Sequence, residues 1–424
     1  MERTLLIGVA EDNRQRWQKI DSLEELQALV KTAGGEVVEK ILQIRDRPDP
    51  ATFLGKGKID ELKQLCEKHK IDLLVFDEPL SATQIRNISQ ITNTRVIDRT
   101  ALILDIFAQH AKTAEAKTQV ELAQLEYRRS NLVGLGVELS RLGGGIGTRG
   151  PGEKKLEVDR RRIRERIAIL KRILAKIDKE RLVQRKLRQP FFKISLVGYT
   201  NAGKSTLMNR LTNANVKVSP ELFATLDSNT KPLILAKNIM VFVTDTVGFI
   251  RNLPHELVAS FRSTLGEIRN ADLILQVVDA SEDDIEQKIK AVEDTLAEIG
   301  CQEKPKLMVF NKIDRVFESN IIKRFKNNYP GSIFISALNN EGIDKLKSAI
   351  LRFVNRQLTT KTFTIPITRG DLINRIYNIG SVVRTIQNDT NITLSVKGYR
   401  SILQKLSKEI KNFKIKPSSS IAAK

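Results

Sequence analysis

GYTNAGKS, residues 198–205, is the stretch of this 424-residue sequence that decides the fold. It matches the P-loop pattern G-x-x-x-x-G-K-[ST], with a strand-like run before it (FFKISLVG, 191–198) and a helical one after it (TLMNRLTN, 206–213). In such a loop the backbone N–H groups hold the α- and β-phosphates of a nucleotide, the lysine reaches the β- and γ-phosphates, and the serine hydroxyl binds Mg²⁺. The residues expected to bind nucleotide here are Gly198, Tyr199, Thr200, Asn201, Ala202, Gly203, Lys204, Ser205 and Thr206, with Ser205 as a metal ligand.

Three further motifs complete a nucleotide site, and each directly follows a strand-like run. The stretch IMVFVTDTVG (239–248) contains Asp245 and ends at Gly248. The Asp245 carboxylate would hold Mg²⁺ through water, and the Gly248 amide would sense the γ-phosphate. Asp314 belongs to an N-K-I-D motif, and its carboxylate can accept both N–H donors on the edge of guanine, which adenine does not offer. The base-binding residues are expected to be Asn311, Lys312 and Asp314, together with the backbone of Ser336, Ala337 and Leu338.

The order of these motifs predicts the architecture as well as the ligand. Motifs at the carboxyl ends of several strands place the ligand in the crevice outside a mostly parallel sheet. The fold class expected is therefore α/β and multidomain, built around a P-loop GTPase domain that binds GTP. Asp314 excludes a kinase or ATPase function, because adenine does not offer the pair of N–H donors that this carboxylate would accept.

A switch threonine is also expected, because a GTPase needs a hydroxyl that binds Mg²⁺ only while the γ-phosphate is present. Thr225, within LFATLDSNTK (222–231), is the candidate, and Thr230 is the alternative. The residues expected to act in hydrolysis are Lys204, Thr225 and Gly248.

Phe249 occupies the position where many signalling GTPases have the Gln that orients the attacking water. An apolar side chain cannot do this, so slow hydrolysis without a partner or another group is expected. Asn201 either supports a K⁺ ion that bridges the phosphates or braces the loop.

Composition limits the remaining possibilities. The formal charge is +21, and residues 141–190 hold 17 Lys and Arg against 6 Asp and Glu, a net of +11. This imbalance favours a polyanion, RNA, over an ordinary solvated helix face. Only Cys66 and Cys301 are present, no signal peptide or run of 18 apolar residues occurs, and a cytoplasmic protein without a membrane span is expected.

Four domains are expected along the chain. Residues 1–100 alternate strand-like and helical runs, so a small N-terminal α/β domain is predicted. Residues 101–189 predict an antiparallel helical hairpin, with Ile163, Ile167, Leu170, Leu174 and Ile177 forming a coiled-coil seam. The GTPase domain is expected over 190–357 and a small α+β domain over 358–424.

Two glycine-containing stretches allow more than one interpretation. GGGIGTRGPG (143–152) contains G-x-G-x-x-G at 145–150, but no clean strand precedes it and one long helical pattern follows, so a flexible basic loop at the hairpin tip is favoured over a dinucleotide site. Arg141, Arg149, Lys154 and Lys155 surround it and are the expected RNA contacts. GKGK (55–58) opens a helix and is read as a helix-start loop, with a phosphate site as the alternative.

Together these residues resemble the HflX family of translational GTPases over nearly the whole chain. The resemblance rests on residues 112–128, on 143–167, on VGYTNAGKSTLMNRLT (197–212), on FATLD (223–227) and on 245–265. It implies a monomeric GTPase that binds the large ribosomal subunit and splits stalled or idle ribosomes, with the hairpin tip reaching ribosomal RNA. It also implies a C-terminal domain, and residues 363–406 fit a ferredoxin-like unit.

The sequence departs from the family pattern at Lys154 and Lys155 and at Ser228 and Asn229, which puts the contacts of the tip and the dynamics of the switch in doubt. Two other functions stay open at this point: a GTPase of ribosome assembly, and an NTP-driven remodeller of ribosomal RNA with a second nucleotide site at 55–58.

Overall fold

A computed structural model describes residues 1–142, 151–188, 190–212, 222–223, 225, 229–251, 262–282, 284–316 and 319–414. Its residues group into two compact units, which are treated separately below. The first comprises 1–179, 219–227 and 250–265, and the second comprises 180–218, 228–249 and 266–424. Among the residues described, no helix is both long enough and apolar enough to cross a membrane.

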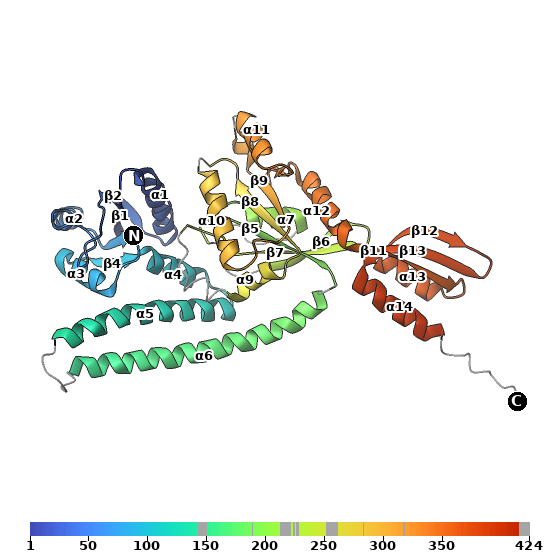
Figure 1. The fold of residues 1–424 in the computed structure, drawn as a ribbon, viewed down its shortest axis with the longest axis horizontal. Coiled ribbons are helices and arrows are strands. Elements are labelled where there is room, and N and C mark those ends of the chain that lie inside the picture. The colour runs from blue at the N-terminus through green and yellow to red at the C-terminus, as the bar shows by residue number, and fades with distance from the viewer. Residues whose placement is uncertain are drawn as a thin grey trace. The chain divides into compact units, whose positions relative to one another are not determined.

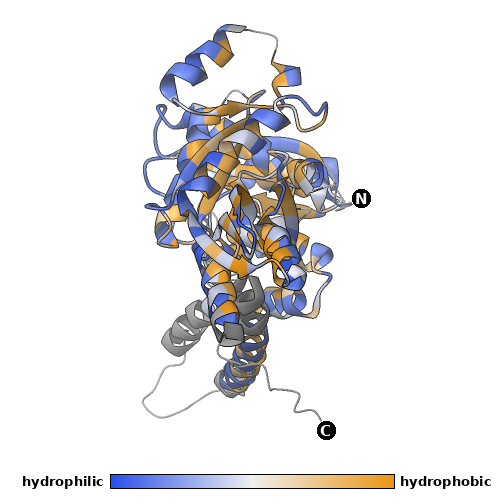
Figure 2. Ribbon diagram, turned by 90° about the vertical axis from the view of Figure 1, so that its right-hand side faces the viewer, coloured by the Kyte–Doolittle hydropathy of each residue, from blue (hydrophilic) through white to orange (hydrophobic). Residues whose placement is uncertain are grey.

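The first unit begins with a four-stranded parallel sheet in the order β2-β1-β3-β4 (Figure 1). Its strands are β1 (Arg3–Ala10), β2 (Glu36–Ile44), β3 (Leu73–Phe76) and β4 (Arg95–Asp98), and the helices between them are α1 (Arg16–Thr32), α2 (Lys56–His69) and α3 (Ala82–Thr92). Seven successive residues of β1 are buried, as expected for a central parallel strand covered on both faces. Across the ribbon, blue hydrophilic and orange hydrophobic residues are interspersed along the helices (Figure 2), as expected for helices with one buried face.

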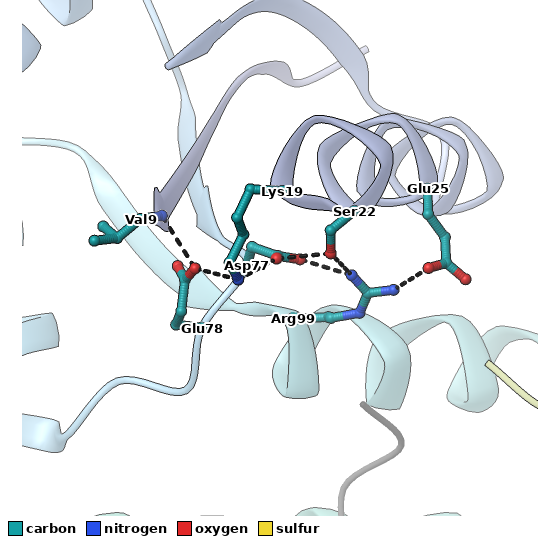
Figure 3. A network of polar contacts seen from close by, with 7 residues as sticks. All are labelled: Val9, Lys19, Ser22, Glu25, Asp77, Glu78 and Arg99. Atoms are coloured by element: carbon teal, nitrogen blue, oxygen red, sulfur yellow. Dashed lines mark hydrogen bonds and ion pairs between the residues drawn. The ribbon is translucent and has the colours of Figure 1, made fainter. Parts of the chain in front are cut away.

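Polar side chains gather where the central strands end (Figure 3). Asp77, which directly follows β3, accepts a hydrogen bond from Ser22 of α1 at 2.7 Å and pairs with Arg99 at 2.6 Å. Lys19 pairs with Asp77 at 3.0 Å and with Glu78 at 2.5 Å. Burial alone would raise the pKa of Asp77, but Arg99 and Lys19 outweigh it and lower that pKa. The network ties α1 to the loop after β3 and to Arg99, which directly follows β4.

Residues 101–130, with which the predicted hairpin begins, form two helices separated by a break that the sequence pattern does not predict. α4 (Arg99–His110) begins with the Asp98 side chain accepting from the Ala101 N–H, and α5 (Ala114–Leu142) follows after a break. At the break Ala111 is extended, and the Thr113 hydroxyl accepts from the Ala116 N–H at 3.1 Å. A hydroxyl at that position caps a helix N-terminus and so starts a new helix.

α5 packs along α6 (Pro151–Arg188), which runs beside it (Figure 1). Leu122 of α5 and Ile167 and Leu170 of α6 are buried together, with Ile163 and Leu174 half-buried against them. Arg166 forms a two-pronged pair with Glu121, at 2.7 and 3.0 Å. The glycine-rich stretch 143–150 lies outside the described residues.

The second unit contains a six-stranded sheet in the order β10-β9-β8-β5-β7-β6. Only β6 runs antiparallel, to β7, so the sheet is mostly parallel as the motif order predicts. The strands are β5 (Phe192–Gly198), β6 (Asn229–Ala236), β7 (Ile239–Asp245), β8 (Leu273–Asp279), β9 (Lys306–Asn311) and β10 (Ile333–Phe334). The helices are α7 (Lys204–Thr212), α9 (Arg262–Arg269, which lies at the boundary of the two units), α10 (Ile285–Glu298), α11 (Ser319–Asn328) and α12 (Ile343–Gln357), with the short 3₁₀ helix η1 (Ile313–Arg315).

A smaller antiparallel sheet, in the order β11-β13-β12, completes the second unit. The elements are β11 (Leu358–Pro366), α13 (Gly370–Ile379), β12 (Ser381–Gln387), β13 (Asn391–Tyr399) and α14 (Arg400–Lys414). The Tyr399 hydroxyl donates to the Met240 carbonyl at 2.7 Å, and Tyr399 packs against Phe191, which joins this sheet to the larger one. A ferredoxin-like unit needs one more strand after the second helix, so that assignment stays a prediction.

Candidate nucleotide site

The P-loop connects β5 to α7 as the sequence predicts, and Lys204 lies folded against it. The Lys204 ammonium donates to the carbonyls of Gly198 and Tyr199 at 3.1 and 2.7 Å. Burial lowers the pKa of Lys204 to about 8, a shift that Asp245 partly opposes. A buried cation held by backbone carbonyls is suited to compensate a phosphate charge in a dry site.

Asn311 joins the P-loop to the base-binding loop. Its side-chain N–H donates to the Ala202 carbonyl at 2.9 Å, and its side-chain oxygen accepts from the Ala337 N–H at 3.0 Å. Gly203 permits this approach, because a Cβ at Gly203 would lie 2.3 Å from the Asn311 amide nitrogen and its φ is +88°. The phosphate end and the base end of the site are therefore fixed relative to each other through one side chain.

Ser205 and Asp245 offer oxygen ligands side by side. The Ser205 hydroxyl donates to the Asp245 carboxylate at 2.6 Å, and Asp245 is fully buried at the end of β7. In the part of the chain that is described, no three His, Cys, Asp or Glu residues gather as a metal site. A hydroxyl with one carboxylate suits Mg²⁺, which keeps several waters and takes its other ligands from phosphates.

The segment after Asp245 lies directly on the P-loop. The Phe249 N–H donates to the Gly198 carbonyl at 3.1 Å, and the Thr200 N–H donates to the Phe249 carbonyl at 2.8 Å. A Cβ at Gly248 would lie 2.8 Å from Thr200 and 3.1 Å from the Lys204 ammonium. The Phe249 side chain is 1% exposed, so it packs in the core and presents no polar group to a water.

The base end combines predicted and unpredicted residues. Asp314 is exposed in η1, Ser336 and Ala337 are buried, and Leu338 is 61% exposed. Lys312 pairs with the buried Asp279 at 2.6 Å.

Arg210 and Asp279 support this end of the site and were missed in the sequence. Arg210 of α7 donates to the carbonyls of Ala337 and Leu338, at 2.9 and 2.6 Å. Asp279 ends the buried strand run LILQVVD, a position that could have drawn attention to it. For Arg210 the sequence carries no signal, since its partners lie more than 120 residues away.

The candidate switch residues lie in different units. Thr225 is half-buried and belongs to the first unit, where the nearby Phe223 packs edge-on against Phe107 of α4 at 4.7 Å between ring centroids. The alternative, Thr230, lies in β6 with its hydroxyl 2.9 Å from that of Thr244.

The remaining candidates are only partly described. Asn201 is exposed in the loop with a left-handed φ of +60°. Arg149 lies outside the described residues, and at Arg141, Lys154 and Lys155 only the helical backbone is described. At 55–58 the Gly55 N–H donates to the Gln43 side chain and Lys58 pairs with Glu61 at 2.8 Å, so these groups already have partners within the protein.

Comparisons with known proteins agree with this geometry. Residues 20–108 match the family described as GTP-binding GTPase N-terminal, residues 110–188 match GTP-binding GTPase Middle Region, and residues 193–312 match 50S ribosome-binding GTPase. A GTPase HflX of Caldanaerobacter subterraneus is 42% identical over 96% of this chain and 93% of its own length. That of Escherichia coli is 41% identical over 89% and 90%. With relatives of this similarity over almost their full length, and with its nucleotide motifs brought to one edge of a single sheet, the chain belongs to the HflX family of GTPases and hydrolyses GTP.

Proposed function

We propose that GTP binds along the carboxyl edge of the larger sheet, with its phosphates on residues 198–206 and its base against Asp314 and the loop 336–338. The observation that carries this proposal is the bridge of Asn311, which holds the two ends of the site together. Lys204 compensates phosphate charge, Ser205 binds Mg²⁺, and Asp245 acts on it through water. Thr225 is the proposed switch residue. Gly248 senses the γ-phosphate.

Hydrolysis then depends on a partner. Phe249 is buried and apolar, so it cannot orient the attacking water, and another group must take that role. A K⁺ ion supported by Asn201 would supply part of the missing positive charge. The ribosome is the proposed partner, and it would complete the site when it binds.

We further propose that the protein binds the large ribosomal subunit through RNA and splits ribosomes into subunits. Exposed cations along α6 support this: Arg162, Arg164, Arg172 and Lys176 have no ion-pair partner among residues whose side chains are described. Arg141, Arg149, Lys154 and Lys155 would extend the same basic surface. Rows of uncompensated cations bind the phosphate backbone.

Sedimentation of intact ribosomes tests the proposal. With GTP, the peak of joined ribosomes should decrease and the two subunit peaks should rise, whereas the Lys204→Ala variant should leave the profile unchanged. An unchanged profile for a wild-type protein that binds GTP normally would reject splitting and favour the role in ribosome assembly.

A further inference from the structure

The small C-terminal sheet has one face that no helix of residues 358–414 covers. Its other face packs on α13 and α14 (Figure 1), where Phe363, Leu394 and Val396 are buried with Leu372, Ile376 and Leu403. Side chains alternate between the faces of a strand, so the neighbours of these buried residues point away from the helices.

The register defines this uncovered face. Thr362 lies opposite Ser395 and Ser395 opposite Arg384, while Thr364 lies opposite Thr393 and Thr393 opposite Ile386. A third row joins Thr360, Lys397 and Ser381. Directly opposite residues share a face. We call the following nine residues the open face: Thr360, Thr362, Thr364, Ser381, Arg384, Ile386, Thr393, Ser395 and Lys397. The register continues beyond them with Pro366 opposite Asn391 at one end and, at the other, with Leu358 opposite Tyr399, a pair that is buried in the core of the larger sheet.

The open face is polar, positively charged and already ordered. Two pairs of hydroxyl groups on neighbouring strands form hydrogen bonds with 3.2 Å between their oxygens, Thr362 with Ser395 and Thr364 with Thr393. None of the nine residues is acidic. Residues 358–414 hold ten Lys and Arg against three Asp and Glu, and two of those acids are paired on the helical side, Asp371 with Arg369 and Glu409 with Arg375.

We infer that the open face binds double-stranded RNA. The wide, shallow minor groove of an A-form duplex displays 2′-hydroxyls and is read by shape and by 2′-hydroxyl and phosphate contacts. Rows of hydroxyls that include Arg384 and Lys397 in neighbouring positions match that chemistry. Tyr399, the aromatic residue in line with these rows, is 8% exposed and packs on Phe191, so it offers no free ring on which single-stranded bases could stack. The exposed apolar residues of β12, Ile386 and Val383 at the bulge beside Arg384, make too small an apolar area for a protein partner.

Binding of a short RNA duplex to the full-length protein tests this without ribosomes or GTP, so its outcome is independent of splitting. Arg384→Glu with Lys397→Glu should weaken binding by at least about tenfold and lower the salt dependence by about two counterions per duplex. The matched control, Lys405→Glu with Lys408→Glu, reverses two exposed charges of α14 on the covered side. Equal losses in both double variants would overturn the inference.

A cross-linking experiment locates the RNA directly. Because Cys66 and Cys301 are buried, a photoreactive maleimide will modify the single added thiol of Thr362→Cys, or of Gln404→Cys on the exposed side of α14. Cross-links to duplex RNA from position 362 and not from 404 are expected. Thr362→Val with Thr364→Val should reduce the preference for RNA over a DNA duplex of the same sequence. Cross-links from both positions, or stronger binding of single strands, would reject the open face as a duplex site.

Discussion

Gly203 shows how one residue without a side chain fixes the geometry of the nucleotide site. Its positive φ and its 2.3 Å Cβ distance to the Asn311 amide both exclude a side chain. Gly203→Ala should therefore displace Asn311 and weaken GDP binding by at least about tenfold, in addition to about 1 to 3 kcal/mol of backbone strain.

Gly331→Ala is the matched control, since Gly331 has a φ of +85° but no atom within 4 Å of its Cβ position. It should lose similar stability in thermal unfolding and keep its nucleotide affinity. If a fluorescent GDP analogue bound both variants with the same loss, the contact with Asn311 would not be what makes Gly203 necessary.

We propose that a second single residue, Asp314, carries the specificity for guanine. It is exposed in η1, so Asp314→Asn should leave the unfolding temperature unchanged. The variant should lose about tenfold or more in GTP affinity, because an amide cannot accept from both N–H donors of guanine, and it should gain affinity for xanthine nucleotides. Competition titrations with the two nucleotides measure this, and an unchanged GTP affinity would remove Asp314 from the site.

At the scale of elements, the buried network of Asp77 holds α1 to the strand ends of the N-terminal sheet (Figure 3). Asp77→Asn removes one of the two carboxylates that pair with Arg99, which is 3% exposed, and leaves Glu25 as its remaining charge partner. The substitution should cost at most about 3 to 5 kcal/mol of unfolding free energy. Glu2→Gln is the control, since the Glu2 pair with Arg95 is more than half exposed on both sides and should contribute less than about 1 kcal/mol.

The difference in unfolding free energy between wild type and Asp77→Asn should depend on pH in a definite direction. The folded pKa of Asp77 lies below its ordinary value of 3.8, so its stabilising contribution is present above that value and is lost as the pH falls through the folded pKa. In urea titrations the difference in unfolding free energy between wild type and Asp77→Asn should become smaller as the pH decreases below 3.8. A gap that stays constant down to about pH 3 would show that charge is not the cause.

The elements also show what sequence reasoning could reach. The four motifs at 198–205, 245–248, 311–314 and 336–338 follow strands β5, β7, β9 and β10. This placement could be predicted because a P-loop and its partners need a strand before them and the apolar runs mark those strands. The break between α4 and α5 was missed, since Ala111 and Ala114 continue the three- and four-residue spacing across it. Contacts such as Arg210 with the 336–338 loop depend on the folded sheet order, which local patterns do not encode.

At the scale of the whole molecule, the charge excess predicts separable functions. The exposed cations of α6 belong to a helix that contains none of the nucleotide motifs, so ribosome affinity and basal GTP hydrolysis should respond to different substitutions. Reversing Arg164, Arg172 and Lys176 to Glu should weaken ribosome binding and lower its salt slope by roughly 2 to 3, at about 0.7 to 0.9 per phosphate contact. GTP affinity and hydrolysis without ribosomes should stay at the wild-type level.

Reversing Lys290, Lys323 and Lys345 makes the same change in net charge on α10, α11 and α12, where all three side chains are exposed. If RNA contact along α6 is specific, this control should keep most of the ribosome affinity, because a general loss of positive charge acts only through screened, long-range attraction. Co-sedimentation with large subunits at several salt concentrations separates the two cases. Equal losses of ribosome affinity in the two triple variants would mean that total charge governs binding. The cations of α6 would then contribute only through the net charge of the protein.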